Sequence, residues 1–324
     1  MRLDITVPDW AEKLMSDLTD MDRAPLAVAP GQVVSYELPD DVYFQYAFGD
    51  AEGRLRPDPA AAERATTIWY GEVSAVRGPE YRPAELAEPP AELTLGATDR
   101  LRFESAALAG HTRRATVYTP AGAPDQPLPL VVVQDGVAAY RTGRLHEVAQ
   151  ALMDRGEARH ARFVFLEPVD RLVEYAFDEA YQRFMHDELL ADLAGRYPPA
   201  ADVVWLGFSL GGLASAQAAL RRTEGSNTVV AFSGAFKGVP EDPDPYRSER
   251  SWLVETLRDP ATALPHDWYL EVGTLEWLLD VNREVARTLR DRGATVRLRE
   301  RPAGHNWTSW RNGLPDALRF ALGR

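Results

Sequence analysis

The chain has 324 residues, a formal net charge of −13 and a hydrophobic content of 45%, which is enough apolar material for one large core or two ordinary ones. The acidic balance and the lack of a basic run argue against nucleic acid as a partner. The sequence contains no cysteine, so thiolate catalysis, disulfides and cysteine-ligated metals are excluded and a reducing, cytoplasmic setting is expected. We also expect neither a signal peptide nor a membrane span, because no apolar run is long enough.

Residues 1–95 are expected to form a separate β-rich domain. Alternating apolar residues predict strands over residues 32–38 and 42–48, and a further β-rich run covers residues 66–76. Residues 11–18 could form a short helix. A proline-rich stretch that cannot continue a helix or a central strand then places the boundary near residue 95; it contains Pro79, Pro83, Pro89 and Pro90.

Residues 96–324 alternate short apolar runs with helical patterns. This alternation predicts an α/β domain, with a mostly parallel twisted sheet covered by helices on both faces. The predicted strands are residues 114–118, 130–133, 163–166, 203–206, 229–232, 268–272 and 296–298. The predicted helices are residues 145–153, 184–194, 213–220 and 278–289.

One serine lies where a predicted strand meets a predicted helix. The segment Gly207-Phe208-Ser209-Leu210-Gly211 has the Gly-x-Ser-x-Gly pattern of the nucleophile elbow of α/β-hydrolases. Such a turn pushes the serine toward positive φ and leaves its glycine neighbours no room for a Cβ. Ser209 is therefore the predicted nucleophile. The alternative is a glycine-rich turn of a doubly wound sheet that carries no chemistry.

A serine nucleophile needs a histidine to take its proton and an acid to hold that ring. In this fold the acid and then the histidine follow the serine in the sequence. His305 lies in a glycine-containing loop after the last predicted strand, so it is the expected base. The five other histidines are interpreted as surface or helix-face residues, namely His111, His146, His160, His186 and His266.

The acid is expected directly after the predicted strand 268–272. Glu276 follows a Gly-Thr-Leu turn there and is the first candidate, with Asp280 one helical turn further on as the second. Glu276 could also serve only to favour the start of a helix, as acidic residues commonly do. Both roles are compatible.

The oxyanion of a tetrahedral intermediate needs backbone N–H donors. Leu210, the residue after the nucleophile, supplies the first by its position. The second is expected from residues 134–137, where an apolar strand breaks into a glycine turn.

Several segments together resemble the enterochelin (ferric enterobactin) esterase family and its wider relatives, the esterase D and antigen-85-like hydrolases. The most specific is His305 to Leu314, which matches the family's His…Trp-Arg-x-Gly-Leu spacing. The other matching segments are residues 43–48, 56–59, 135–137, 171–175, 188–190 and 207–212. The likeness covers about residues 40 to 320.

The resemblance implies an α/β-hydrolase domain preceded by an immunoglobulin-like domain. It implies Ser209 as nucleophile, His305 as base and the amides of Val137 and Leu210 as oxyanion donors. Glu276 lies where the antigen-85-like relatives carry a glutamate after a Gly-Thr turn. Some members of the family manage with a serine and a histidine alone.

The preferred hypothesis is a serine esterase that needs no metal or organic cofactor and whose substrate is a small ester, of which a catecholate siderophore is one candidate. A strongly anionic substrate would need local cations on this acidic chain. The expected cations are Arg141, Arg144, Arg171 and Arg311, and the expected aromatic pocket residues are Phe208, Trp307 and Trp310, although Trp310 could belong to the core. An acyltransferase or a general aryl or carbohydrate esterase on the same site, and a binding protein without activity, remain as alternatives.

Overall fold

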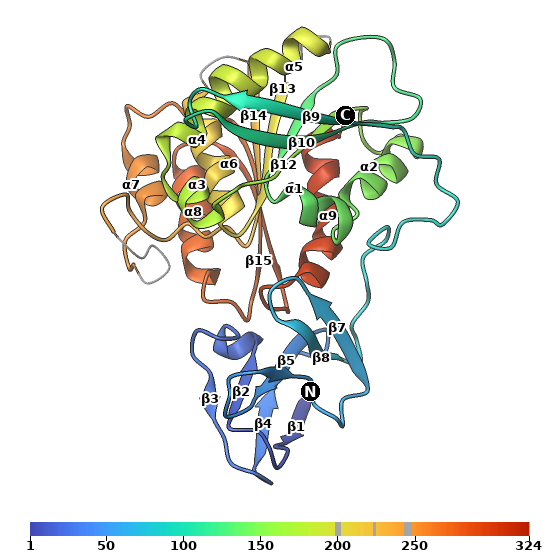
Figure 1. The fold of residues 1–324 in the computed structure, drawn as a ribbon, viewed down its shortest axis with the longest axis vertical. Coiled ribbons are helices and arrows are strands. Elements are labelled where there is room, and N and C mark those ends of the chain that lie inside the picture. The colour runs from blue at the N-terminus through green and yellow to red at the C-terminus, as the bar shows by residue number, and fades with distance from the viewer. Residues whose placement is uncertain (198–201, 223–224, 243–247, 324) are drawn as a thin grey trace. The chain divides into compact units, whose positions relative to one another are not determined.

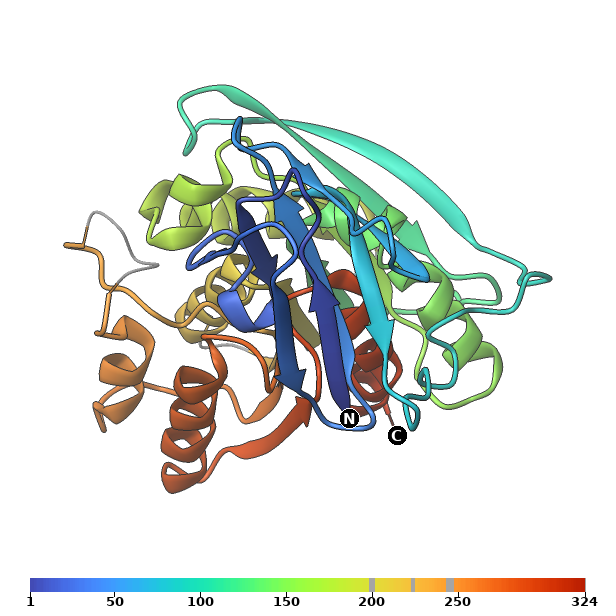
Figure 2. The same ribbon diagram turned by 90° about the horizontal axis from the view of Figure 1, so that it is seen from below.

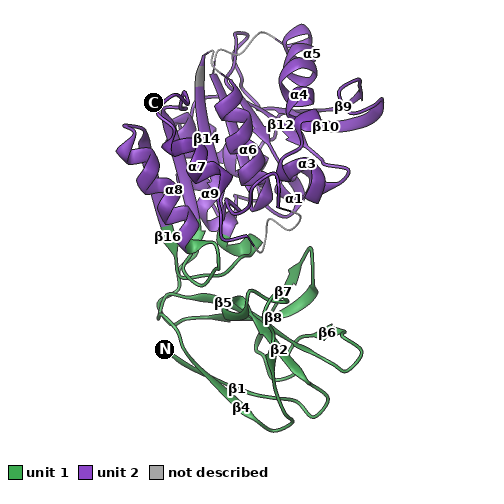
Figure 3. Cartoon of the chain, turned by 90° about the vertical axis from the view of Figure 1, so that its left-hand side faces the viewer, with its two compact units in different colours: residues 1–83, 272–279, 300–309 green, residues 84–271, 280–299, 310–324 purple. Residues whose placement is uncertain are grey.

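The computed structural model describes residues 1–197, 202–222, 225–242 and 248–323, and its fold is drawn in Figure 1. The chain forms two compact units that are discontinuous in sequence (Figure 3). The first, which we call the β unit, contains residues 1–83, 272–279 and 300–309. The second, the α/β unit, contains residues 84–271, 280–299 and 310–324. The domain boundary near residue 95 stays a prediction, and nothing in the sequence suggests that two late segments return to the β unit.

The β unit is built from antiparallel strands, which run side by side in the blue part of the chain (Figure 2). One sheet has the order β3-β2-β5-β8-β7 with β6 paired to β5, and β1 pairs with β4 in a second. The strands are β1 (Arg2–Thr6), β2 (Lys13–Ser16), β3 (Leu26–Ala27), β4 (Val33–Glu37), β5 (Tyr43–Gly49), β6 (Leu55–Arg56), β7 (Glu63–Thr67) and β8 (Gly71–Arg77). The predicted β-rich character of this part of the chain is confirmed.

Strand β5 is buried on both faces. Phe44, Tyr46 and Phe48 point into a core shared with β1 and β4, as their period-2 alternation predicts. On the other face, Tyr43 packs with Ala303 from the returning segment 300–309. The Tyr43 N–H also donates to the carbonyl of Pro302 at 2.9 Å, so this segment is tied to the strand by its backbone.

One local expectation for the β unit is wrong. Residues 11–18 form β2 and a 3-10 turn (Asp17–Thr19) instead of a helix, because Lys13 to Ser16 pair with β5 and tertiary pairing overrides helix propensity. The predicted β-rich run over residues 66–76 is confirmed, and it is divided between two strands. These residues contain a turn that joins β7 to β8 as a hairpin, with Gly71 at φ +71°, a conformation that glycine adopts readily.

The α/β unit contains an eight-stranded sheet with the order β16-β15-β14-β13-β11-β12-β10-β9. Strands β11 to β15 are parallel to one another, whereas β10 pairs antiparallel with β12 and forms an antiparallel edge ribbon with β9. The strands are β9 (Ala97–Ser105), β10 (His111–Thr119), β11 (Leu130–Val133), β12 (Arg162–Leu166), β13 (Asp202–Phe208), β14 (Ser226–Phe232), β15 (Asp267–Gly273) and β16 (Thr295–Arg301). The predicted fold class is confirmed.

Helices cover both faces of this sheet, with α6 and α8 on one side and α2 and α9 on the other (Figure 1). The helices are α1 (Gly136–Arg141), α2 (Leu145–Asp154), α3 (Arg171–Ala176), α4 (Glu179–Arg183), a π-helical turn (Phe184–Leu189), α5 (Leu190–Arg196), α6 (Leu210–Arg221), α7 (Trp252–Arg258), α8 (Leu279–Asp291) and α9 (Trp307–Leu322). The predicted helix 184–194 is therefore a π-helical turn continued by α5. No helix in the described part of the chain has the length and apolar character that a membrane crossing needs.

Candidate active site

Ser209 occupies a sharp turn between β13 and α6. Its backbone has φ 55° and ψ −121°, a conformation that costs a non-glycine residue about 1–3 kcal/mol. Backbone bonds hold the turn: the Ser209 N–H donates to the Phe232 carbonyl at 2.8 Å, and the Ser209 carbonyl accepts from the amides of Gly212 and Ala235. The strained residue is thus fixed by strand β14 on one side and the start of α6 on the other.

The glycines beside Ser209 are required by close backbone approach. A Cβ on Gly207 would lie 2.0 Å from the Gly211 carbonyl oxygen, and one on Gly211 would lie 2.9 Å from the Cβ of Gln134. Helix α6 therefore begins in close contact with the strand before it. At its first residue, Leu210, a helical N–H has no acceptor within the helix.

His305 and Glu276 form a direct pair within the β unit. The His305 Nδ1 and the Glu276 Oε2 are 2.7 Å apart. The side chain of Glu276 is fully buried and that of His305 is 15% exposed. A carboxylate can only accept, so Nδ1 carries the shared proton and the lone pair of the neutral ring lies on Nε2.

The returning segments of the β unit explain how this pair forms. The Thr274 N–H donates to the Arg301 carbonyl, and the Leu275 N–H donates to the Ala303 carbonyl. The loop that carries Glu276 is therefore bonded to the loop that precedes His305. The Gly273 N–H donates to the other Glu276 oxygen at 2.8 Å, which fixes the orientation of the carboxylate.

Asp280, the second candidate for the acid, lies on α8 in the α/β unit. Its side chain is 96% exposed, and it contacts Arg283 at 3.6 Å. An exposed carboxylate of this kind is well hydrated and interacts weakly. Of the two candidates, it is Glu276 that hydrogen-bonds the His305 ring.

Aromatic and acidic side chains of the β unit surround the His305 ring. Trp277 lies at a centroid distance of 4.7 Å and Trp69, from the β7–β8 turn, at 6.2 Å. The backbone N–H of Trp277 donates to the Asp20 carboxylate at 3.1 Å, and burial raises the pKa of Asp20. The imidazole is thus positioned from two sides by indole rings.

Asp17 lies behind the pair and has an unusual environment for a carboxyl group. It is 3% exposed, it accepts the Gln45 N–H at 2.7 Å, and it packs so closely on the loop that a Cβ on Gly304 would lie 2.1 Å from its Cγ. Burial raises the pKa of Asp17 to about 8. The group is therefore mostly protonated at neutral pH, and no second negative charge is added beside Glu276.

The loop after β11 carries the second predicted oxyanion donor, Val137. Its N–H donates to the Glu167 Oε2 at 2.8 Å, and Glu167 follows the end of β12. Burial raises the pKa of Glu167. A substrate oxygen that used the Val137 amide would have to replace this carboxylate as the acceptor.

Comparison with known proteins identifies the family. The family model described as "Putative esterase" matches residues 105–321, which is more than half of the chain. The chain belongs to this esterase family. Membership makes it a carboxylic ester hydrolase, as the sequence predicted.

Solved structures with the fold of this esterase cover between three quarters and nearly all of its length. The ferric enterobactin esterase of Salmonella typhimurium aligns with a TM-score of 0.78 at 17% identity, covering 99% of this chain and 92% of that one. The enterochelin esterase of Shigella flexneri aligns with a TM-score of 0.73 at 20% identity, covering 98% and 91%. A ferulic acid esterase of Anaeromyces mucronatus aligns with a TM-score of 0.57 at 13% identity, covering 75% and 96%. Comparison with curated proteins gives no match.

The predicted cationic residues of the esterase are mostly engaged in ion pairs. Arg171 forms two bonds with the Asp135 carboxylate, at 2.7 and 2.8 Å, and a third with the Phe208 carbonyl. Arg144 pairs with Glu147 and Glu88, and Arg311 also contacts Glu88, at 2.6 Å. These contacts give the three arginines structural partners, and their contact with substrate stays a prediction.

The predicted aromatic residues of the esterase are buried. Phe208 is 1% exposed and stacks on Phe232 at a centroid distance of 5.1 Å. Trp310, also 1% exposed, donates its indole N–H to Ser233, so the alternative that it belongs to the core is confirmed. Trp307 is 7% exposed and lines a small pocket of the β unit together with His305. Substrate contact by Phe208 and Trp307 stays a prediction.

One histidine differs from the expected surface position. His146, on α2, is 4% exposed, and its ring stacks on Tyr140 at 3.8 Å with an interplanar angle of 3°. Burial lowers the pKa of His146 to about 4, so the ring is neutral near pH 7. His146 does lie on a helix, as predicted, but its side chain faces the interior of the α/β unit instead of the surface.

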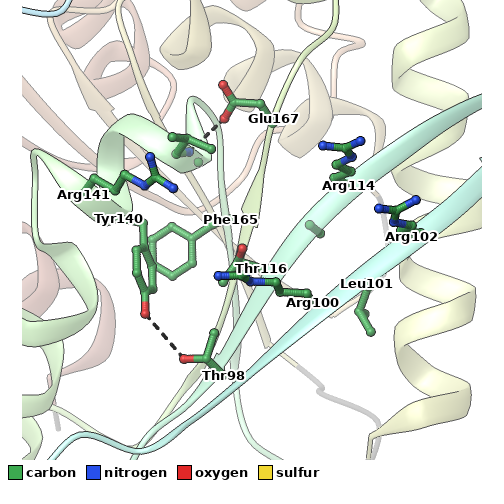
Figure 4. Close-up of a pocket in the computed structure, with 13 residues that line it drawn as sticks. Thr98, Arg100, Leu101, Arg102, Arg114, Thr116, Tyr140, Arg141, Phe165 and Glu167 are labelled. Carbon is green, nitrogen blue, oxygen red and sulfur yellow. Dashed lines mark hydrogen bonds between the residues drawn. The ribbon is translucent and has the colours of Figure 1, made fainter.

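Sequence analysis missed three arginines on the edge ribbon: Arg100, Arg102 and Arg114. They line a cavity of about 480 Å³ together with Arg141 and Val137 (Figure 4). The alternation Arg100-x-Arg102 in a β-type run was the signal available for them. Among the described residues, no group of three or more His, Asp and Glu side chains is placed to hold a metal ion.

Proposed function

We propose that this esterase hydrolyses its substrate through an acyl-enzyme, with Ser209 as nucleophile, His305 as general base and Glu276 as the acid that holds the histidine. The observation that carries the proposal is the 2.7 Å contact between His305 Nδ1 and a fully buried Glu276 carboxylate. This contact selects the tautomer whose Nε2 can accept a proton. The strained backbone of Ser209 supports the assignment of the nucleophile.

The reaction then proceeds in two steps. The Ser209 hydroxyl loses its proton to His305 Nε2 while its oxygen attacks the ester carbonyl, and the imidazolium that forms is stabilised by Glu276. The protonated ring next gives the proton to the departing alcohol. Water, activated by the same ring, releases the acid and frees Ser209.

The oxyanion of each tetrahedral intermediate would be bound by the amides of Leu210 and Val137. Leu210 is the first residue of α6, where the helix dipole also favours negative charge. Use of the Val137 amide requires that the substrate oxygen displaces Glu167 from its present bond. The pair of oxyanion donors would thus be complete only with substrate bound.

The substrate class that we propose is a small ester whose acyl part carries an aromatic ring, with catecholate siderophore esters as the leading case. Structural neighbours named as enterobactin and ferulic acid esterases support this class, because the compounds named with them, 2,3-dihydroxy-N-benzoyl-serine and ferulic acid, each carry an aromatic ring. No specific observation favours the acyltransferase alternative.

The first experiment is hydrolysis of 4-nitrophenyl acetate by wild type, Ser209→Ala and, as a matched control, Ser35→Ala, whose serine is exposed in β4. We expect Ser209→Ala to lower kcat/KM by about 10⁴-fold or more and Ser35→Ala to leave it unchanged. Wild-type activity in Ser209→Ala would overturn the nucleophile. Iron-free and ferric enterobactin and methyl ferulate then rank the substrates, and product analysis with added glycerol separates hydrolysis from acyl transfer.

A further inference from the structure

The cavity of about 480 Å³ in the α/β unit lies beside the predicted oxyanion loop. Strands β9 and β10 form one wall, and helix α1 with the end of β12 forms the other (Figure 4). Because Val137 is one of its lining residues, a group bound there would lie near the residue whose amide we assign to the oxyanion. We call it the arginine cavity, after Arg100, Arg102, Arg114 and Arg141.

The register of the β9–β10 ribbon gathers positive charge on one face. Arg102 and Arg114 are direct cross-strand partners, and Arg100 is opposite Thr116. Residues directly opposite each other, and residues two apart on one strand, share a face of the ribbon. Two like charges placed directly opposite each other destabilise a ribbon. The stability of the β9–β10 ribbon therefore does not account for this arrangement.

The four arginines of the cavity have no ion-pair partner among the residues that the structure describes. By contrast, three arginines of the α/β unit outside the cavity lining each form an ion pair with a carboxylate, namely Arg144, Arg171 and Arg311. The cavity lining contains one carboxylate, Glu167, and its Oε2 already accepts the Val137 N–H. On a chain of net charge −13, four unpaired guanidinium groups around one cavity create a local field that attracts anions.

The same cavity presents a rigid aromatic wall. Tyr140 lines it and is stacked on the buried His146 at 3.8 Å, with Phe165 at 5.2 Å edge-to-face. The Tyr140 hydroxyl lies 3.5 Å from that of Thr98, another lining residue. Because the neutral His146 fixes the tyrosine ring from behind, a flat ligand would meet a preformed surface.

We propose that the arginine cavity binds an aromatic ring that carries anionic oxygens, as part of the ester substrate next to the scissile bond. Arginine suits this ligand because its planar guanidinium forms paired hydrogen bonds with carboxylate or phenolate oxygens and also stacks on rings. The inference rests on the proposed function for its place in the reaction. Binding itself does not depend on catalysis and is tested separately.

The binding test uses isophthalate, a benzene ring with two carboxylates, titrated by calorimetry into three proteins. These are wild type, Arg102→Gln/Arg114→Gln, and a control, Arg287→Gln/Arg299→Gln. Arg287 and Arg299 are also exposed arginines of the α/β unit, and Arg299 lies on β16 at the opposite edge of the sheet from β9. Arg102→Gln/Arg114→Gln removes the repulsion between the two arginines, so its thermal unfolding midpoint should not fall. A difference in binding can then be assigned to the lost charges instead of to unfolding.

We expect wild type and control to bind isophthalate alike, and Arg102→Gln/Arg114→Gln to bind it about tenfold more weakly or worse. Binding should also weaken between 50 and 300 mM salt, as expected for exposed charges. Equal binding by wild type and Arg102→Gln/Arg114→Gln, or no binding by wild type, would overturn the site. Inorganic phosphate is a second probe, and if it binds as tightly as isophthalate the aromatic part of the proposal is wrong.

The kinetic test compares 4-nitrophenyl benzoate with mono(4-nitrophenyl) isophthalate, which differ by one carboxylate. For wild type the ratio of kcat/KM values should favour the anionic ester, and in Arg102→Gln/Arg114→Gln that ratio should fall about tenfold. An unchanged ratio would contradict the proposed position of the ligand. If Ser209→Ala instead retains the hydrolysis of both esters, the proposed function fails while the calorimetric result still decides the binding site.

Discussion

The elbow around Ser209 and the His305–Glu276 pair are two parts of one predicted site, and they are built in different ways. The elbow comes from contiguous residues of β13 and α6, and its backbone, hydrogen-bonded to Phe232 and Ala235, holds the serine at φ 55°. The pair joins side chains that are 29 positions apart, on two loops that return to the β unit. The elbow is therefore a property of local sterics, whereas the pair is a property of tertiary assembly.

This difference predicts two kinds of failure. A larger residue in place of an elbow glycine brings its Cβ into contact with the backbone and damages folding, since no side-chain movement can relieve that contact. A change in the pair leaves the loops bonded to each other through their backbones and removes chemistry. Stability and activity measurements should therefore separate the two regions.

Gly207→Ala should have the largest effect. The new Cβ would lie 2.0 Å from the Gly211 oxygen and 2.2 Å from the Gly211 carbonyl carbon, so β13 and α6 must move apart. We expect a loss of more than about 4 kcal/mol in the free energy of unfolding, measured by urea denaturation, and little folded protein. Gly195→Ala on α5, where a Cβ meets nothing within 4 Å, is the matched control and should be neutral or stabilising by about 1 kcal/mol or less. A stable Gly207→Ala protein would mean that the elbow is not sterically fixed.

Glu276→Gln should have the next largest effect, and on activity instead of stability. The glutamine oxygen can still accept the Gly273 N–H, but its amide group favours the wrong tautomer of His305. We expect kcat to fall on the order of 10²–10⁴-fold, with a small change in thermal midpoint. The control is Asp280→Asn, whose carboxylate is 96% exposed, and it should retain full activity. Equal losses in the two variants would remove the distinction between the two acids.

Asp17→Asn should have the smallest effect near pH 5, and a distinctive pH dependence above it. Burial raises the pKa of Asp17 from 3.8 to about 8, so the folded state keeps a proton that the unfolded chain loses. Between about pH 4 and pH 8 this group alone lowers the free energy of unfolding as pH rises, by at most about 1.4 kcal/mol per pH unit.

Asparagine does not titrate, so Asp17→Asn should lose less stability than wild type between pH 5 and pH 8. Chemical denaturation at both pH values measures the difference. Asp41→Asn, an exposed position, should follow the wild-type pH dependence. Parallel curves for wild type and Asp17→Asn would contradict the buried, protonated state.

The sequence predicted those elements whose pattern is local and strong. The seven expected strands of the α/β unit all occur. Strands β11 to β15 carry the apolar runs of strands covered on both faces, whereas β10 and β16 show alternation. The edge strand β9 was missed, since its exposed face alternates charged residues, and α9 was not predicted as a helix. The prediction of a helix over residues 11–18 was wrong because pairing with β5 outweighed the helical pattern.

By itself, the sequence determined the α/β fold, the elbow at Ser209 and the candidates His305 and Glu276, because each depends on residues close together in the chain. Tertiary structure decided how distant groups meet. It joined His305 to Glu276 and not to Asp280, it put Glu167 on the Val137 amide, and it brought Arg102 opposite Arg114. Strand register and loop return depend on long-range contacts, and a local pattern of residue types carries no direct record of them.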